Sequence, residues 1–426
     1  MLLKKSLLLG SLLILTLGAC SKEEEKSSNS KEVEVSFWRP QADALEDGWY
    51  IQKVQEFNEL NKGKIKVNME VISRGNSFAY EDKVNTNSIS NTLPDILSLD
   101  GPNVANYAHS NIIVPLNDNF KSEELDDFLP SIISQGTYKD KLYALGLSES
   151  SVVLFYNKSI MKDLGIDLES KVTPENPLTI EEVYDISKKA KENLGVYGIN
   201  WINDKGEWMT YCFGQFWLSN GTNIVSPDGF KSEGYINSEE GIKAAKYIQS
   251  FVKDGLFNID PLPTEFQLGK AAFMLGGTWN IKGFKDYKDL DWGITYFPTL
   301  GKNTSPSGSW ALSISKDSKN QEQAAEFIKF ITNKENSLSL AKTISMPASR
   351  KSALESIEEY ENTQLKVIKD QLKNTAIPRP VTPAYTIVTA KFAQALNDIM
   401  IGANVENSLN KAAKDIDLNI SKTLKK

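Results

Sequence analysis

The chain has 426 residues, with 48 Lys and Arg against 55 Asp and Glu and a formal net charge of −7. It therefore lacks the excess of cations on which nucleic-acid binding rests. It holds one histidine and two cysteines, too few for a zinc cluster or a disulfide framework. We expect no cofactor, no metal site and no nucleic-acid partner. A chain of this length exceeds one compact core, so we expect two domains.

The first 20 residues predict export. Lys4 and Lys5 precede an uninterrupted run of apolar and small residues that ends at Cys20. This pattern is typical of a secretory signal peptide, and the run is short for a transmembrane helix. Leu17-Gly18-Ala19-Cys20 resembles a bacterial lipobox, which implies cleavage before Cys20 and acylation of its thiol. An ordinary signal peptide with an unmodified cysteine is the alternative. We expect a signal peptide at 1–19 and a lipid-anchored protein on the extracellular face of the cell membrane.

Residues 20–32 are expected to form a lipidated cysteine and a flexible tether. Residues 21–32 contain no apolar side chain, so they cannot bury surface to offset the entropy lost on ordering. This segment needs only to be soluble in order to link the anchor to the folded domains.

The first folded region predicts a parallel sheet. Apolar and polar residues alternate over 33–37, which indicates a strand, and apolar residues at helical spacing predict a helix over about 48–61. Residues 65–71 alternate again, and a further short strand is predicted at Ile96 to Leu99. A strand, a helix and a second strand in this order form a βαβ unit, which favours a mainly parallel sheet.

A second group of elements begins near residue 151. Residues 152–156 are β-prone, and a capping box predicts a helix over 180–194. Two more helices are predicted, one from Asn237 to Gly255 and one carried by apolar residues over 405–420. Because the link between the two groups is short, we expect two closely apposed lobes with a cleft between them.

The lone histidine and the second cysteine are interpreted as structural. His109 ends an apolar helical pattern, and Cys212 lies between Tyr211 and Phe213, where it is expected to pack as a small buried hydrophobe. Walker, GxGxxG and GxSxG signatures are absent from the sequence.

Seven short motifs follow one another along the chain: VSFW at 35–38, TLPDIL at 92–97, IIVPL at 112–116, KLYAL at 141–145, LFYNK at 154–158, GKAAFM with GTW at 269–279, and RPVTPAY at 379–385. In this order, and behind a lipobox, they resemble the extracellular solute-binding proteins of ABC importers, the large sugar-binding group that includes maltose-binding protein. The resemblance covers nearly all of the chain after the tether.

The resemblance implies an α/β fold of the periplasmic-binding-protein type (class II), with two interleaved lobes, a hinge between them and a ligand cleft at their interface. The expected crossings lie near 148–152, near 297–299 and after Thr332. The corresponding lobes are residues 33–149 plus 299–334 for lobe 1 and 150–298 plus 335–426 for lobe 2.

The resemblance also implies a function. The protein would be a monomer that captures a sugar or oligosaccharide by hinge closure and delivers it to the transmembrane subunits of an ABC permease, without altering it.

Sugar faces stack on aromatic rings, so loop-borne aromatic residues beside small residues are the candidate platforms. Trp279 follows Gly276-Gly277-Thr278, where the resemblance places a stacking aromatic, and Tyr385 lies near where the family often has another. Trp49 and Trp292 are expected to be core residues, while Trp201 and Trp208 stay open. The further candidates are Trp38, Trp310, Tyr211 and Trp217.

Polar candidates lie where strands end or the chain crosses between lobes. Asp100 ends a strand before Gly101-Pro102, and its carboxylate would accept hydroxyl hydrogen bonds. The resemblance places a ligand contact at the first crossing, where Ser150 and Ser151 offer hydroxyls instead of the carboxylate of maltose-binding protein. Arg379 either holds the C-terminal loop or grips a charged sugar. Two more candidates follow the first strand, Arg39 and Asp43.

Two other functions are alternatives to binding. A glycoside hydrolase needs two carboxylates flanking the scissile bond, and no such pair can be recognised in the sequence. A surface adhesin or sensor would use the same fold. Turnover, saturable binding without turnover, or neither would distinguish the three.

Overall fold

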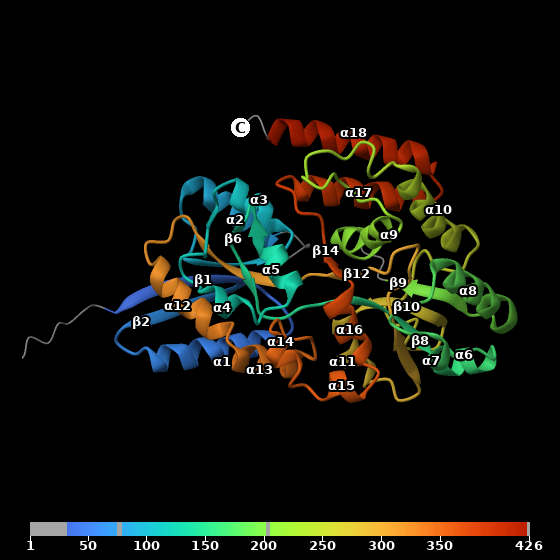
Figure 1. Cartoon of the computed structure of the whole chain (residues 1–426), viewed down its shortest axis with the longest axis horizontal. Coiled ribbons are helices and arrows are strands. Elements are labelled where there is room, and N and C mark those ends of the chain that lie inside the picture. Colours follow the sequence, from blue (N-terminus) through green and yellow to red (C-terminus); the bar gives the residue numbers. More distant parts are fainter. Residues whose placement is uncertain (1–31, 75–78, 202–204, 424–426) are drawn as a thin grey trace, which may run out of the picture.

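The computed structural model describes residues 32–74, 79–201 and 205–423. This part of the chain forms two lobes, each built on a β-sheet flanked by helices (Figure 1). The signal peptide, Cys20 and the tether up to residue 31 lie outside the described residues. The predicted two-lobe α/β fold is confirmed.

Lobe 1 is built on a six-stranded sheet of order β2-β1-β3-β13-β4, with β7 paired to β13. Val33 lies opposite Ile65 in the parallel β1–β2 pair, and β3 is parallel to β1, which confirms the predicted βαβ unit. Strand β13 arrives from much later in the chain and runs antiparallel to β3. The strands are β1 (Val33–Pro40), β2 (Ile65–Ile72), β3 (Ile96–Asp100), β4 (Ile113–Val114), β7 (Leu145–Gly146) and β13 (Trp310–Ser315).

Helix α1 (Ala44–Leu60) connects β1 and β2 and begins earlier than the predicted start at Gly48. The side chain of Asp43 accepts hydrogen bonds from the backbone N–H groups of Leu45 and Glu46, at 2.8 and 2.9 Å. These bonds satisfy donors that have no partner within the helix, so Asp43 is an N-cap residue. The helix buries its apolar face through Trp49, Tyr50, Val54 and Phe57.

Lobe 2 is built on a four-stranded sheet of order β11-β8-β10-β9. The predicted capping box of α8 (Ile180–Leu194) is confirmed, because Thr179 and Glu182 exchange side-chain and backbone hydrogen bonds. Helix α10 (Glu239–Lys253) is capped by Ser238 rather than by the predicted Asn237. The strands are β8 (Val152–Asn157), β9 (Tyr197–Trp201), β10 (Ala271–Gly277) and β11 (Trp292–Thr295).

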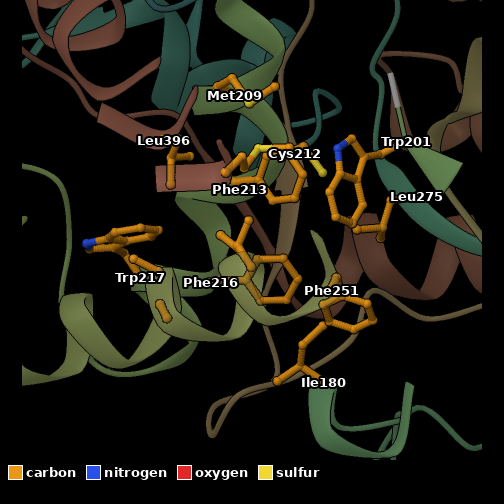
Figure 2. Close-up of a cluster of buried hydrophobic side chains, with 14 of the residues drawn as sticks. Ile180, Trp201, Met209, Cys212, Phe213, Phe216, Trp217, Phe251, Leu275 and Leu396 are labelled. Carbon is orange, nitrogen blue, oxygen red and sulfur yellow. The ribbon is translucent and has the colours of Figure 1, made fainter. Parts of the chain in front are cut away.

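The core of lobe 2 is rich in aromatic side chains (Figure 2). Trp217, on α9 (Gly214–Ser219), has an exposed fraction of 0% and donates its indole N–H to the carbonyl of Ile236 at 2.8 Å. Its prediction as a cleft residue is therefore wrong: helical packing against Phe392 of α17 (Tyr385–Met400) turns the ring inward. Cys212 is buried as predicted, and burial raises the pKa of its thiol.

Three other tryptophans pack in the interior. Trp49 is buried and Trp292 is half-buried against the ring of Phe155, as expected for core residues. Trp201, which the sequence left open, is buried and stacks on Phe257 with ring centroids 3.9 Å apart.

Two short strands form the hinge between the lobes. β12 (Ser305–Ser307) pairs in parallel with β14 (Ala376–Pro378), and Ser307 also bridges to Ser151 in the first crossing segment. Leu300 still packs in the core of lobe 2, so the second crossing follows it at β12 instead of near 297–299.

The third crossing lies further along the chain than the expected position after Thr332. Helix α13 (Lys334–Ile344) packs on α1, where Trp49 Nε1 donates to Ser339 Oγ at 3.0 Å. Helix α14 (Lys351–Leu354) is also held to lobe 1, because Asp127 accepts the backbone N–H of Ser352 at 2.9 Å. These contacts place residues 335–354 with lobe 1, contrary to the expected boundary at 335.

Further helices complete both lobes. Within the described ranges, none is long and apolar enough to cross a membrane, and no group of three His, Cys, Asp or Glu side chains is placed to hold a metal ion. His109 contacts Tyr138 through Nδ1 and the phenol oxygen at 3.1 Å, a structural position. Among these helices are α2 (Ala79–Ser90), α3 (Asn103–His109), α5 (Pro130–Gly136), α12 (Gln321–Ile331), α16 (Lys366–Asn374) and α18 (Val405–Thr423).

Candidate functional site

A cleft of about 510 Å³ lies between the two lobes. Lobe 1, the hinge and lobe 2 all contribute side chains, so closure of the lobes would enclose its contents. The residues that carry most of its polar and aromatic surface are Arg39, Glu46, Tyr50, Arg74, Asp100 and Trp310 from lobe 1, Ser148, Ser150, Ser309 and Arg379 from the hinge, and Glu207, Trp208, Tyr211 and Trp279 from lobe 2.

A second depression, of about 680 Å³, is larger but takes residues from lobe 2 alone. It lies over α8, α10 and the start of α18 and is lined by Tyr184, Lys246 and Glu406 among others. Movement of the lobes would not close it, so the interlobe cleft is the better candidate site.

The lobe 2 wall of the cleft is aromatic. Trp279 has an exposed fraction of 39%, an unusual value for so large an apolar ring. It stacks on Tyr211 with centroids 6.1 Å apart at 29°, and Trp208 meets it edge-on at 6.0 Å. A Cβ at Gly277 would lie 2.1 Å from the Trp279 ring, so only glycine lets the ring fold back over the strand end.

The lobe 1 wall carries charges that are paired within the lobe. Arg39 is buried and forms ion pairs with Glu46, at 2.9 Å, and with Asp47. Its guanidinium lies 4.0 Å from the centroid of the Tyr50 ring. Burial raises the pKa of Glu46, and the Arg39 charge partly offsets that shift. Arg39 is thus fixed by α1 before any ligand arrives.

Trp310 adds an aromatic surface on the lobe 1 side, at the start of β13. The guanidinium of Arg74 lies 5.1 Å from the centroid of the Trp310 ring, and Tyr80 meets that ring edge-on at 6.2 Å.

Trp38 lines no part of the cleft. Strand alternation places it on the face opposite Arg39, where Lys83 Nζ lies 4.2 Å from the ring centroid.

Arg379 is engaged by the protein's own carboxylates. It binds Asp100 through two hydrogen bonds, of 3.0 and 2.6 Å, and Glu207 through one of 2.7 Å. Burial raises the pKa of Glu207, the Arg379 charge opposes that shift and Asp100 adds to it. Tyr385 is buried behind this cluster and donates its hydroxyl to Glu207, so it does not line the cleft.

The hinge serines differ in position. Ser150 lines the cleft, and its hydroxyl lies 2.8 Å from the Tyr211 hydroxyl. Ser151 is buried, donates to the carbonyl of Pro306 at 2.8 Å and accepts from Gln371 Nε2 at 2.9 Å. Its prediction as a ligand residue is wrong, because the hinge uses its hydroxyl.

Glu149, which the sequence did not single out, is a buried carboxylate of the hinge. It accepts hydrogen bonds from the Ser131 hydroxyl at 2.5 Å and from the backbone N–H groups of Ser150 and Gly308, at 2.9 and 2.8 Å. Burial raises its pKa to about 6, against the lowering effect of the Ser131 hydrogen bond. Glu149 thus ties two crossing segments to α5 of lobe 1.

The structure brings together seven of the twelve predicted ligand residues: Trp279, Tyr211, Trp310, Asp100, Ser150, Arg39 and Arg379. Their contact with a ligand remains a prediction. The other five lie elsewhere: Tyr385, Trp217 and Ser151 are buried, Trp38 is on the other face of its strand, and Asp43 caps α1 outside the cleft.

The cleft also contains side chains that were not among the predicted ligand residues, and Glu207, Trp208 and Arg74 are three of them. The sequence leaves Trp208 open between core and cleft. Glu207 precedes it directly in the segment after β9, so a carboxylate beside a loop tryptophan was the available signal.

Comparison with known proteins identifies the family. Residues 52–367 match the model of the bacterial extracellular solute-binding protein family. That range covers more than half of the chain. The chain belongs to this family, which confirms the resemblance seen in its motifs, and it is an extracellular solute-binding protein.

Two proteins similar to this chain are named as oligosaccharide-binding proteins. The galactooligosaccharide-binding protein of Bacillus subtilis is 29% identical over 346 residues, which cover 76% of this chain and 75% of that protein. The maltooligosaccharide ABC transporter solute-binding lipoprotein of Streptococcus pneumoniae is 26% identical over 98% of this chain and 95% of its own length.

Solved structures show the same fold. The cyclic alpha-maltosyl-1,6-maltose binding protein from Arthrobacter globiformis has a TM-score of 0.77 at 21% identity, covering 92% of this chain and all of that one. An ABC substrate-binding protein from Listeria monocytogenes, in complex with cycloalternan, has a TM-score of 0.75 at 20% identity, covering 92% and 99% of the two chains.

Proposed function

We propose that the protein captures a sugar or oligosaccharide in the interlobe cleft, by closure of the lobes, and delivers it to the transmembrane subunits of an ABC importer. The observation that carries the proposal is the pairing of an aromatic wall with a polar one. Trp208, Tyr211 and Trp279 offer ring faces for sugar C–H groups. Asp100, Ser150 and Arg39 lie opposite or beside them and suit hydroxyls.

Two further points support this proposal. The cleft volume of about 510 Å³ lies within the usual range for small-molecule sites, roughly 300–1,000 Å³. The names of the two relatives above both specify oligosaccharides, and the Streptococcus pneumoniae protein is named as part of an ABC transporter.

A thermal-shift screen of the purified protein against mono- and oligosaccharides tests the ligand. A ligand that binds only the folded state raises the melting temperature as its concentration rises. Small-angle scattering should then give a smaller radius of gyration with the active saccharide than without it. If no saccharide shifts the melting temperature while solutes of another class do, the sugar assignment is wrong.

We further propose that binding proceeds without catalysis. The ligand recovered after prolonged incubation should be chemically unchanged. Conversion of a bound oligosaccharide would favour the glycoside hydrolase alternative, in which two cleft carboxylates such as Asp100 and Glu207 would act on the glycosidic bond.

The lipid anchor at Cys20 and the monomeric state belong to the same proposal. Cys20→Ala should abolish labelling by a fatty-acid analogue and release the protein from the membrane fraction. Labelling that survives the change would refute the lipobox interpretation. Light scattering of the soluble form should give the mass of one chain with and without ligand.

A further inference from the structure

The side chain of Arg379 connects the two lobes beside the hinge strands. Asp100 ends β3 of lobe 1, and Glu207 lies before the π-helical turn Met209–Phe213 of lobe 2. Arg379 contacts both carboxylates, with hydrogen bonds of 2.6 to 3.0 Å. Its side chain is almost wholly buried, and Asp100 and Glu207 are largely buried as well.

Arg379 is itself fixed to the hinge. It follows β14 directly, and β14 pairs with β12. A Cβ at Gly308 would lie 3.0 Å from Arg379 Nη2, and the Tyr211 ring lies 4.8 Å from the guanidinium carbon. The guanidinium therefore has little room to follow one lobe if the other moves away.

The two carboxylates are fixed to their own lobes. Glu207 accepts hydrogen bonds from the hydroxyls of Tyr385 and Thr389 on α17, the second at 2.7 Å. Asp100 is held by the β3–β13 ladder through its pairing with Trp310. Separation of the lobes must therefore part Arg379 from at least one carboxylate. Loss of a buried charge partner is unfavourable unless water replaces it.

We propose that Arg379 is a positioning residue that holds the lobes together in the ligand-free protein by pairing with Asp100 of lobe 1 and Glu207 of lobe 2. The inference rests on the proposed function only in that lobe closure is the binding motion. A closed arrangement that is already populated lowers the free energy that the ligand must supply for closure, and so tightens apparent binding.

Arg39 provides the matched comparison. It also lines the cleft and also pairs with two carboxylates, but Glu46 and Asp47 belong to its own lobe. Asp47→Asn removes a charge partner from a cleft arginine without affecting any contact between lobes. Asp100→Asn removes the equivalent partner from Arg379. The two variants differ in whether the lost ion pair crosses the cleft.

The test is the distance between lobes in the absence of ligand, measured by spin labels at two exposed positions. Ile89 on α2 is 84% exposed and Leu418 on α18 is 55% exposed, so both accept a cysteine and a label. The chain from Ser21 onward lacks Cys20, and Cys212 is buried, so labelling is confined to the introduced sites. Arg379→Ala and Asp100→Asn should shift the distribution to longer distances, with the ratio of open to closed protein rising on the order of tenfold from a parent that populates both arrangements.

Conservative variants separate positioning from folding. Arg379→Lys keeps the charge but cannot form the two-pronged contact with Asp100, so it should restore part of the short-distance population. Asp47→Asn should leave the distribution unchanged. If Arg379→Ala fails to fold, Asp100→Asn and Glu207→Gln carry the same expectation.

Two results would overturn the inference. One is an unchanged distribution in Asp100→Asn and Glu207→Gln. The other is a lower melting temperature in the Arg379 variants with no change in distance, which would make Arg379 a merely structural residue. Because no ligand is present, either result leaves the sugar proposal untouched. Failure of the saccharide screen, in turn, would leave the distance result standing.

Discussion

The two walls of the cleft differ in the side chains that dominate them. On the lobe 1 wall, Arg39 of β1 is paired with two carboxylates of α1 in its own lobe and presents fixed hydrogen-bonding groups. On the lobe 2 wall, Trp279 and Tyr211 present stacked rings, with Trp279 partly exposed. Ion pairs already formed within the protein leave little need for a charged ligand. For the proposed sugar ligand, we therefore expect lobe 1 to orient hydroxyls and lobe 2 to supply stacking energy.

Lobe 2 also shows how the same residue type serves two purposes. Trp217 and Trp279 belong to one lobe, yet one is fully buried and the other is 39% exposed. Trp217 lies on a helix between other helices, whereas Trp279 follows a strand end with glycines. The local element, not the residue type, decides which ring reaches the cleft. Substitution of each ring tests this difference.

The largest effect is expected for Trp217→Ala, on stability. Loss of a buried tryptophan with a satisfied indole N–H should lower the free energy of unfolding by about 3–5 kcal/mol. Denaturant unfolding measures this change. Trp217→Phe keeps much of the packing and should lose less. A Trp217→Ala variant with unchanged stability and lost ligand affinity would place Trp217 in the site after all.

Trp279→Ala should instead weaken ligand binding and leave the stability of the protein nearly unchanged. Removal of an aromatic anchor from a binding site costs on the order of 2 kcal/mol of binding free energy, roughly thirtyfold in affinity. The melting temperature without ligand should hardly change, because the ring is partly exposed. Calorimetric titration with the active saccharide measures the loss. A large fall in stability with near-native affinity would return Trp279 to the core and leave Trp310 as the better platform.

The Glu149 carboxyl lies at the hinge between the two walls. Its raised pKa predicts that the stability of the protein depends on pH. Its pKa is raised by burial to about 6, so the folded state binds the proton more tightly than the unfolded chain. The group therefore stabilises the fold below pH about 4.5, and this contribution of about 2 kcal/mol is lost as the pH rises through about 6. Glu149→Gln should remove this part of the pH profile, measured by unfolding at several pH values. An identical profile in the variant would contradict the assignment.

The sequence was most informative where local patterns decide structure. The alternation over 33–37 and 65–71, and the capping box at Thr179, appear as β1, β2 and the start of α8. Trp279 could be located because a glycine turn precedes it. The order of the motifs along the chain is enough to predict the family.

The sequence was least informative where distant segments meet. Tyr211 and Trp217 stand six positions apart in one aromatic run, and only packing against α17 shows that one faces the cleft and the other the core. Glu207 and Asp100 become neighbours only through Arg379, whose position depends on the hinge strands. The last crossing was placed too early because the packing of α13 on α1 is a long-range contact.

The smallest effect is expected for substitution of Asp43. It tests whether this residue contacts the ligand or only supports the helix behind the lobe 1 wall. The sequence suggested a ligand contact, whereas the structure shows Asp43 capping α1, the helix that carries Glu46 and Asp47. Loss of an N-cap side chain typically costs about 1 kcal/mol, so Asp43→Ala should lower the free energy of unfolding by about that amount. Asp43→Asn and Asp43→Ser retain a capping oxygen and should stay near the parent.

Ligand affinity decides between the two roles of Asp43. As a cap outside the cleft, it should leave the dissociation constant for the active saccharide within about twofold in all three variants, well under 1.4 kcal/mol of binding free energy. A tenfold loss in Asp43→Asn, with stability intact, would mean that the carboxylate reaches the ligand once the lobes close. The lobe 1 wall would then extend past Ala42 to the start of α1, and its contrast with the aromatic wall would be greater than the structure shows.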